Sequence, residues 1–257
     1  MALAGHRAPF LPTLVANQTE KLMQSKVAFL MTAVCLIASA PVAGAQIGSS
    51  LPVFPGRFTV GGDFAVSQPK GEFAANVPTG YGFDVNGQMK LDPKGWLSLR
   101  ADGGSVRYGH EQIPLGFFNG IELNLNTDNT IEFGAIGLQF QFPDGWLRPY
   151  ANASYAGVHL KTESCVSNPD NLVEDQCHSN HGDWASATVF GGGIMIPFGK
   201  SLAALNLGAR YHYGAKATYL RRGDIVDNPD GSVTLNVRSS KTDLVLWQIG
   251  VSYTFPR

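Results

Sequence analysis

The last apolar stretch of the chain decides the fold prediction. Residues 245–255 read VLWQIGVSYTF. Large apolar side chains occupy every second position, from Val245 through Trp247 to Phe255, and mostly smaller or polar residues such as Gln248 and Ser252 lie between them. Because successive side chains of a β-strand point to opposite faces, this alternation predicts a strand with one apolar and one polar face.

The same period of two recurs upstream of this stretch. The alternating segments run roughly over 57–68, 79–91, 96–108, 129–142, 147–160, 184–197, 201–214 and 242–255. Turn residues separate them, and no amphipathic helical stretch of convincing length intervenes. Eight such segments predict an all-β fold.

Segment length indicates which face is inside. Each segment has about 12 residues, whereas strands of soluble proteins usually have about five or six and a tilted transmembrane strand needs about 9–11. Aromatic residues gather at segment ends, as in the rims of membrane barrels: Trp96, Trp146, Tyr150, Trp184, Tyr211, Tyr213, Tyr253 and Phe255. We therefore expect the apolar faces to point outward into lipid. The alternative is a soluble sandwich with these faces inward.

The connections alternate in length. Short turns at 92–95, 143–145 and 198–200 alternate with long connections at 69–78, 109–128, 161–183 and 215–241. An open sheet edge in lipid would leave backbone groups unpaired, so the sheet must close. The pattern predicts an eight-stranded antiparallel up-and-down transmembrane β-barrel, with both ends of the chain on the short-turn side.

Composition agrees with β structure rather than a helical bundle. The chain has 257 residues, 30 of them Gly, with 15% charged and 11% aromatic residues and a net charge of −1. A helical membrane protein would be more apolar and a disordered chain less aromatic. The near-neutral charge predicts no nucleic-acid partner.

The N-terminal region reads as an export signal. Lys26 precedes the apolar run Val27–Ala40, which is too short to span a bilayer comfortably, and Ala43-Gly44-Ala45 follows. We expect residues 1–45 to hold a secretory signal peptide, cleaved after Ala45, behind an N-terminal extension that starts at Met1 or Met23. Residues 46–257 would then form the barrel domain.

Two cysteines remain after the signal. In an exported chain, Cys165 and Cys177 predict a disulfide. The alternative is a metal site with His178 and His181, which is less favoured because zinc sites usually pair cysteines at closer spacing. We expect no cofactor.

Charged residues occur on the strand faces that we expect to line the lumen. An eight-stranded barrel has an interior just wide enough for side chains, and opposite charges there should pair because an unpaired buried charge is costly. We expect an ion-paired plug, with a narrow polar conduit as the alternative. The inward charges are Asp63, Asp84, Lys90, Arg100, Asp102, Glu132, Arg148 and Arg210.

Three sequence motifs resemble those of a known family. Residues 248–255 fit polar-x-Gly-x-x-aromatic-x-aromatic, 145–150 read GWLRPY, and the glycines at 191–193 precede Pro-Phe-Gly-Lys at 197–200. The chain resembles the small eight-stranded outer-membrane barrels of Gram-negative bacteria, the OmpA-type or opacity-like transmembrane domain, without the peptidoglycan-binding domain. Pro256-Arg257 after the terminal aromatic departs from the family pattern. The resemblance implies that periplasmic chaperones and the barrel assembly machinery are partners of the chain. It also implies an assembly signal that this machinery recognises, made of Gln248, Gly250, Tyr253 and Phe255.

Catalytic motifs are missing from the sequence. Lipid A deacylases on this scaffold use a His and a Ser two residues apart on one strand face, whereas His178 and Ser179 are adjacent and would face opposite ways. No Gly-x-Ser-x-Gly elbow, phosphate loop or HExxH occurs. We expect no enzymatic activity.

The long connections are the remaining candidates for function. Ile113, Leu115, Phe117 and Phe118 could meet a host or cell-surface ligand, or pack at the barrel mouth. Lys216, Arg221 and Arg222 could bind lipopolysaccharide phosphates in the outer leaflet.

Taken together, these features predict an outer-membrane barrel with a structural, envelope-integrity or adhesion-like surface role. The alternative is a narrow porin-like or OmpW-like passage for small solutes. A lipid-modifying enzyme is the third reading.

Overall fold

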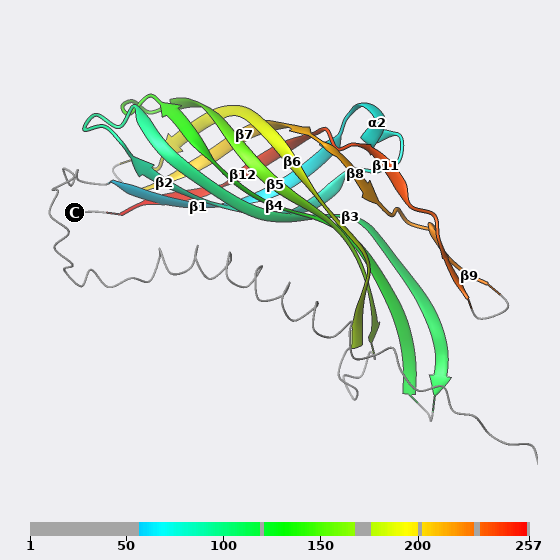
Figure 1. Ribbon diagram of the computed structural model, residues 1–257. Helices are drawn as coiled ribbons and strands as arrows, with labels where there is room; N and C mark the ends of the chain where they lie inside the picture. The colour runs from blue at the N-terminus through cyan, green and yellow to red at the C-terminus, as the bar shows by residue number, and fades with distance from the viewer. Residues whose placement is uncertain (1–56, 119–120, 168–175, 200–201, 229–231, 256–257) are drawn as a thin grey trace, which may run out of the picture. The chain divides into compact units, whose positions relative to one another are not determined.

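The chain closes into an antiparallel barrel, as the alternation predicts (Figure 1). The computed structural model describes residues 57–118, 121–167, 176–199, 202–228 and 232–255. The order of hydrogen-bonded strands is β1-β12-β7-β6-β5-β4-β3-β2, and β1 pairs with β2 on its other side. The barrel strands are β1 (Phe58–Pro69), β2 (Gly80–Lys90), β3 (Leu97–Phe118), β4 (Ile121–Gln141), β5 (Arg148–Ser167), β6 (Gln176–Pro197), β7 (Ala203–Gly214) and β12 (Leu244–Thr254).

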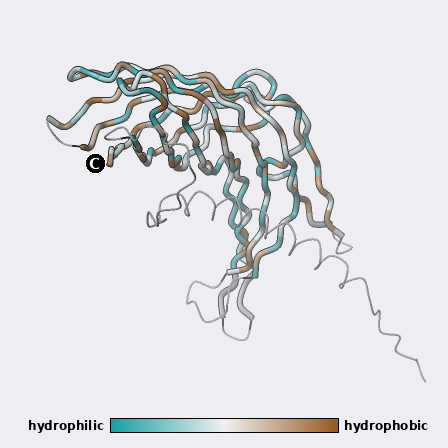
Figure 2. Tube along the Cα trace, turned by 60° about the vertical axis from the view of Figure 1, so that its left-hand side comes forward, coloured by the Kyte–Doolittle hydropathy of each residue, from teal (hydrophilic) through white to brown (hydrophobic). Residues whose placement is uncertain are grey.

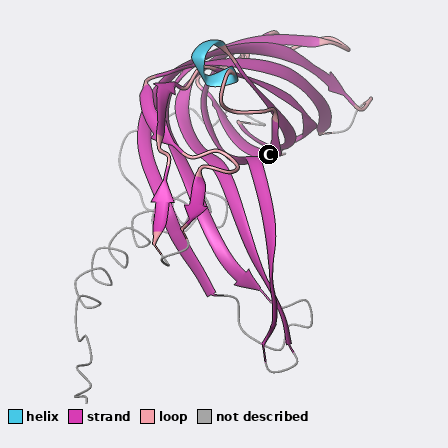
Figure 3. Cartoon of the chain, turned by 90° about the vertical axis from the view of Figure 1, so that its right-hand side faces the viewer, coloured by secondary structure: helices cyan, strands magenta, loops and turns pink. Residues whose placement is uncertain are grey.

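Smaller elements lie in the long connections. The helix α2 (Gly71–Ala74) joins β1 to β2 (Figure 3), and β8 (Lys216–Tyr219) pairs with β11 (Arg238–Lys241). The strands β9 (Ile225–Asp227) and β10 (Val233–Leu235) form a separate hairpin. No helix in the described part of the chain is long and apolar enough to cross a membrane. The predicted signal peptide and its cleavage after Ala45 lie outside the described residues.

Two expected loops are strands instead. The strands β3 to β6 have 20 to 22 residues each, whereas β1, β2, β7 and β12 have 11 or 12. Most of the expected connections 109–128 and 161–183 therefore continue the barrel strands as a protruding sheet, which we define as 109–118, 121–128, 162–167 and 176–183 (Figure 1). Cross-strand hydrogen bonds between polar side chains support it, such as Thr127 Oγ1 to Ser164 Oγ at 2.7 Å.

The barrel wall is apolar outside and polar inside over its short-turn half. Phe64, Phe83 and Ile136 point outward and are each more than half exposed, whereas Asp84 and Arg100 are buried inside. Figure 2 shows the resulting alternation of hydrophobic and hydrophilic residues along the strands. An outward apolar surface with a polar interior is the reverse of a soluble sandwich and is typical of membrane barrels.

Towards the protruding sheet the lumen becomes apolar. Here Val106, Ile131 and Leu246 point inward and form a buried apolar cluster. Phe73 of α2 folds over this end of the barrel, with its ring 5.1 Å from that of Tyr219 in an edge-on arrangement. The interior is thus layered, with charged and amide side chains in one half and apolar side chains in the other.

Candidate functional site

A buried cluster of charges occupies the polar half of the lumen. Asp102 Oδ1 accepts a hydrogen bond from Nε of Arg100 at 2.8 Å and forms ion pairs with Nη2 of Arg100 at 2.6 Å and Nη1 of Arg210 at 2.9 Å. Arg210 also lies 3.8 Å from Asp84. These four side chains are at most 1% exposed. The cluster is the arrangement expected of an ion-paired plug, because each guanidinium has a carboxylate beside it.

The neutral partners of this cluster were not singled out by the sequence. Asp63 accepts from Asn86 at 2.9 Å and from Asn206 at 2.7 Å, and Asn206 accepts from the hydroxyl of Tyr150 at 2.9 Å. Arg100 donates to Gln139 Oε1 at 2.8 Å. Inward parity on the strands places these residues in the lumen, but it does not tell which of them touch.

Three of the predicted lumen charges lie apart from this cluster. Lys90 and Arg148 do line the lumen, where they are half-buried near the short turns. For Glu132 the expectation is wrong, because Glu132 shares the parity of the exposed Ile136 and lies on the outer face, with Oε2 at 3.4 Å from Nδ1 of His159. At this level Ile131 takes the inward position, since the lumen is apolar there.

The side chains that fill the lumen argue against the alternative of a polar conduit. Arg100 and Gln139 are completely buried, Arg210 is 1% exposed, and Ile131 and Leu246 in the apolar layer above are 1% exposed each. Side chains at both levels therefore occupy the lumen. This arrangement favours a filled barrel over an open passage.

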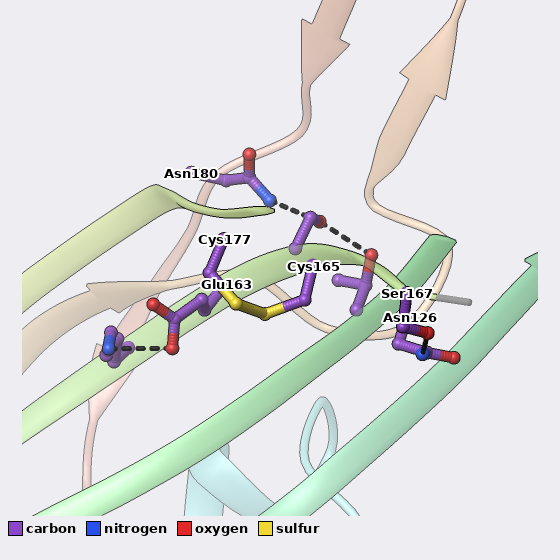
Figure 4. The surroundings of a disulfide bond; sticks show 9 residues. Asn126, Glu163, Cys165, Ser167, Cys177 and Asn180 are labelled. Carbon is purple, nitrogen blue, oxygen red and sulfur yellow. Dashed lines mark hydrogen bonds and ion pairs between the residues drawn. A yellow bond between two sulfur atoms is a disulfide. The ribbon is translucent and has the colours of Figure 1, made fainter. Parts of the chain in front are cut away.

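Cys165 and Cys177 are joined by a disulfide near the tip of the protruding sheet (Figure 4). They are directly opposed in the β5–β6 ladder. Nearby, Asn180 donates to Ser164 at 2.6 Å and Asn126 donates to Ser167 at 2.6 Å. With both sulfurs bonded to each other, neither cysteine is a thiolate ligand, and no three metal-ligating side chains are grouped for an ion within the described ranges.

The predicted lipopolysaccharide cations do not form one cluster. Lys216 begins β8, whereas Arg221 and Arg222 follow its far end. Arg221 is partnered by Asp224, with Nε at 3.4 Å, and Arg238 binds the same carboxylate at 3.1 Å. Lys216 instead lies opposite Lys241 in the β8–β11 ladder, and both are exposed.

A carboxylate ties β8 to the barrel. Asp183 Oδ2 accepts from the backbone N–H and from the hydroxyl of Thr218, both at 2.7 Å. These hydrogen bonds from Thr218 lower the pKa of Asp183 below its usual range, because they favour the charged form. His181 of β6 also bonds the hydroxyl of Thr218, with its Nε2 at 3.1 Å, so two side chains of β6 attach the β8–β11 ladder.

The residues assigned to the assembly signal divide between the two faces of β12. Gln248 is buried in the lumen, and Gly250 lies opposite Asp63 of β1. Tyr253 and Phe255 point outward, with ring centroids 5.4 Å apart in an edge-on contact. The polar and aromatic positions of the motif therefore point to opposite sides of the wall.

Comparisons with known proteins return structures only. No family model matches the chain, and no curated protein sequence matches it. Among solved structures, Ail of Yersinia pestis is 11% identical, with a TM-score of 0.38 over 77% of this chain and 96% of that one. Neisserial surface protein A is 14% identical, with a TM-score of 0.38 over 77% and 97%.

A major outer membrane protein of Thermus thermophilus is also similar, at 12% identity and a TM-score of 0.38 over 77% of this chain and 99% of that one. Similarity at this level says nothing about activity or partners. The closed strand order of the chain itself establishes the fold. The chain is an eight-stranded antiparallel β-barrel, and the solved structures similar to it are small outer-membrane barrels.

Proposed function

We propose that the protein is an integral outer-membrane barrel with a non-enzymatic surface-interaction role. The outward apolar wall supports the membrane location, since Phe64, Phe83 and Trp247 are each at least half exposed and burying such side chains in lipid is favourable by about 1.5–3 kcal/mol each. In this arrangement the short turns face the periplasm and the protruding sheet faces outward from the cell.

The protruding sheet is the observation that supports the surface role. The strand β2 pairs with β3 only as far as Arg107, while β3 continues to Phe118. No strand in the described ranges pairs with the free side of β3 beyond that point. A free edge presents unpaired backbone N–H and C=O groups, to which a strand of another protein can add.

Side chains at this end offer apolar contacts. Ile113 on β3 is 42% exposed, and Val226 and Val233 on the β9–β10 hairpin are 42% and 57% exposed. Pro114 follows Ile113 in β3 and removes one donor from the edge. A partner would therefore pair with the segment 109–113. The side chains of Leu115, Phe117 and Phe118 lie outside the described residues.

The phosphates of lipopolysaccharide would bind a different surface, on the strands β8 and β11. We propose that Lys216, with Lys241 opposite it, contacts lipid phosphates, because two cations directly opposed on a strand pair repel each other unless an anion lies between them. Arg221 contributes less, since Asp224 already partners it. Chaperones and the assembly machinery remain expectations from the resemblance.

The membrane location is tested by fractionation. The protein should appear in the outer-membrane fraction and change its gel mobility when heated in SDS, because lipid-embedded barrels resist SDS until boiled. A protein that stays in the soluble periplasm with no heat shift would contradict the proposal.

The surface role is tested with cells that display the protein. Adherence to cultured host cells should fall when Ile113 is replaced by Lys, because a charge on an edge strand opposes strand addition. The matched control is Val233→Lys on the β9–β10 hairpin, which leaves the β3 edge intact. Undiminished adherence of Ile113→Lys would exclude the β3 edge. Equal loss in both variants would assign the contact to the apolar surface instead.

A further inference from the structure

A polar cavity lies inside the barrel at the short-turn end. Its volume is about 180 Å³, and every one of the eight barrel strands contributes to its lining. One water molecule needs only roughly 10–15 Å³ of such space. We call this cavity, lined by Thr59, Gln88, Lys90, Ser98, Gln141 and Arg148 among others, the cup.

The cup is charged with one sign. Among the residues that the structure describes, Lys90 and Arg148 are the only charged ones that line the cup, and no carboxylate lines it. Neither cation has an ion-pair partner among the residues that the structure describes, and Nε of Arg148 is buried without a hydrogen-bond partner. The nearby Asp92, on the adjacent turn, accepts instead from the backbone N–H groups of Lys94 and Leu97.

Neutral amide side chains lie on the inner side of the cup. The Nε2 group of Gln139 donates to Gln88 at 3.0 Å and to Gln141 at 2.9 Å, and its Oε1 accepts from Arg100. Within the described residues, Gln141 donates in turn only to the sulfur of Met195, at 3.4 Å. Because a thioether is a weak acceptor, this amide would bind an oxyanion in preference to the sulfur.

We propose that the cup binds a small oxyanion, a phosphate or a carboxylate group, which enters from the short-turn side. Arg148 offers the planar set of N–H donors that matches such an anion, and Lys90 adds a point charge. Neither cation must break an existing ion pair first. The volume admits a small anion or the end of a larger molecule, and no folded partner.

The cup is a closed end rather than the mouth of a conduit. Gln139, which donates to the lining residues Gln88 and Gln141, is completely buried, and so is Arg100, which donates to Gln139. An anion bound there would therefore leave by the side on which it entered. The cup also lies at the opposite end of the barrel from the protruding sheet, so it is independent of the surface role proposed above.

Calorimetric titration of the detergent-extracted full-length protein with inorganic phosphate at fixed ionic strength tests this site. Hydrogen bonds to charged groups are typically worth enough to change affinity about tenfold or more. We therefore expect about a tenfold loss of phosphate affinity in Lys90→Gln and in Arg148→Gln, and recovery in Lys90→Arg. Acetate should compete with phosphate if the cup also accepts carboxylates, whereas phosphate binding without competition assigns the cup to phosphate alone.

Two further variants test whether the effect is specific to the cup. Lys94→Gln removes a charge from the exposed turn beside the cup and should leave affinity unchanged. Ser98→Glu places a carboxylate inside the cup and should abolish phosphate binding while the heat shift in SDS persists. No binding by the wild-type protein, or equal affinity in Lys90→Gln and Lys94→Gln, would overturn the proposal.

Discussion

Cys165 and Cys177 are direct cross-strand neighbours on β5 and β6, with Cα atoms 4.0 Å apart and a separation of 12 residues in the chain. The bond therefore closes the tip of the protruding sheet rather than linking it to the barrel. Its effect should be confined to that sheet.

Removing the disulfide should loosen the tip and leave the barrel folded. A crosslink over a loop of this size stabilises by about 3 kcal/mol on the chain-entropy model. In the double variant Cys165→Ser and Cys177→Ser, hydrogen exchange and protease cleavage should increase within 162–183. The temperature of the SDS heat shift should stay the same, and a large fall in that temperature would show that the tip supports the barrel.

The buried carboxylate at position 102 should matter more than an exposed one. Asp102→Asn leaves Arg100 and Arg210 short of negative charge inside the lumen, and breaking a buried pair typically costs about 3–5 kcal/mol. The matched control is Asp128→Asn, because Asp128 pairs with Arg107 at 3.4 Å and with His110 at 2.7 Å while its side chain is 33% exposed. Its loss should cost less than about 1 kcal/mol. Urea titrations monitored by tryptophan fluorescence compare the two, and equal midpoints would contradict this ranking.

Barrel closure should depend on Gly250. A Cβ at this position would lie 2.5 Å from both Cα and Oδ1 of Asp63 on the neighbouring strand, whereas a Cβ on Gly62 meets nothing within 4 Å. Overpacking of this kind costs about 1–3 kcal/mol. Gly250→Ala should therefore lower the yield of the SDS-resistant form in refolding assays, and Gly62→Ala should not. Equal yields would mean that β1 and β12 can separate slightly without loss.

Acid should weaken the attachment of β8 to β6, which Asp183 shares with His181. Because the folded pKa of Asp183 is lowered by Thr218, the bond contributes its full stability above the unfolded carboxyl value, 3.8, and loses it as pH falls through the folded value. The amide resonance of Thr218 should shift over that acidic range. In Asp183→Asn this shift should vanish. A shift that persists in Asp183→Asn would assign the titration to another group.

The fold could be predicted from the sequence because membrane strands carry a two-residue period in their own side chains. Val245, Trp247 and Ile249 define an outward face without reference to any other part of the chain. Turn residues at 92–95 and 143–145 then define the strand ends. Closure follows, since lipid cannot satisfy an open sheet edge.

The two-residue period disappears where lipid no longer contacts the strands. The strands of the protruding sheet carry polar residues such as Asn126, Thr127 and Ser164, so they show no one-sided alternation and resemble loops in sequence. Glu132 lies on the outer face for a related reason. Near that end the lumen becomes apolar, and a charge no longer marks an inward position.

Sequence alone therefore determined the strand number, the outward faces and the cysteine pair, because each depends on local periodicity or on residue identity. Only the tertiary structure decided which lumen side chains meet. Asp102 and Arg210 lie on strands β3 and β7, and their 2.9 Å contact exists only because the closed wall brings those strands face to face across the lumen. The tertiary structure also decided that no carboxylate of the described residues meets Lys90 and Arg148 in the cup, since pairing across a barrel depends on strand register and curvature rather than on sequence order.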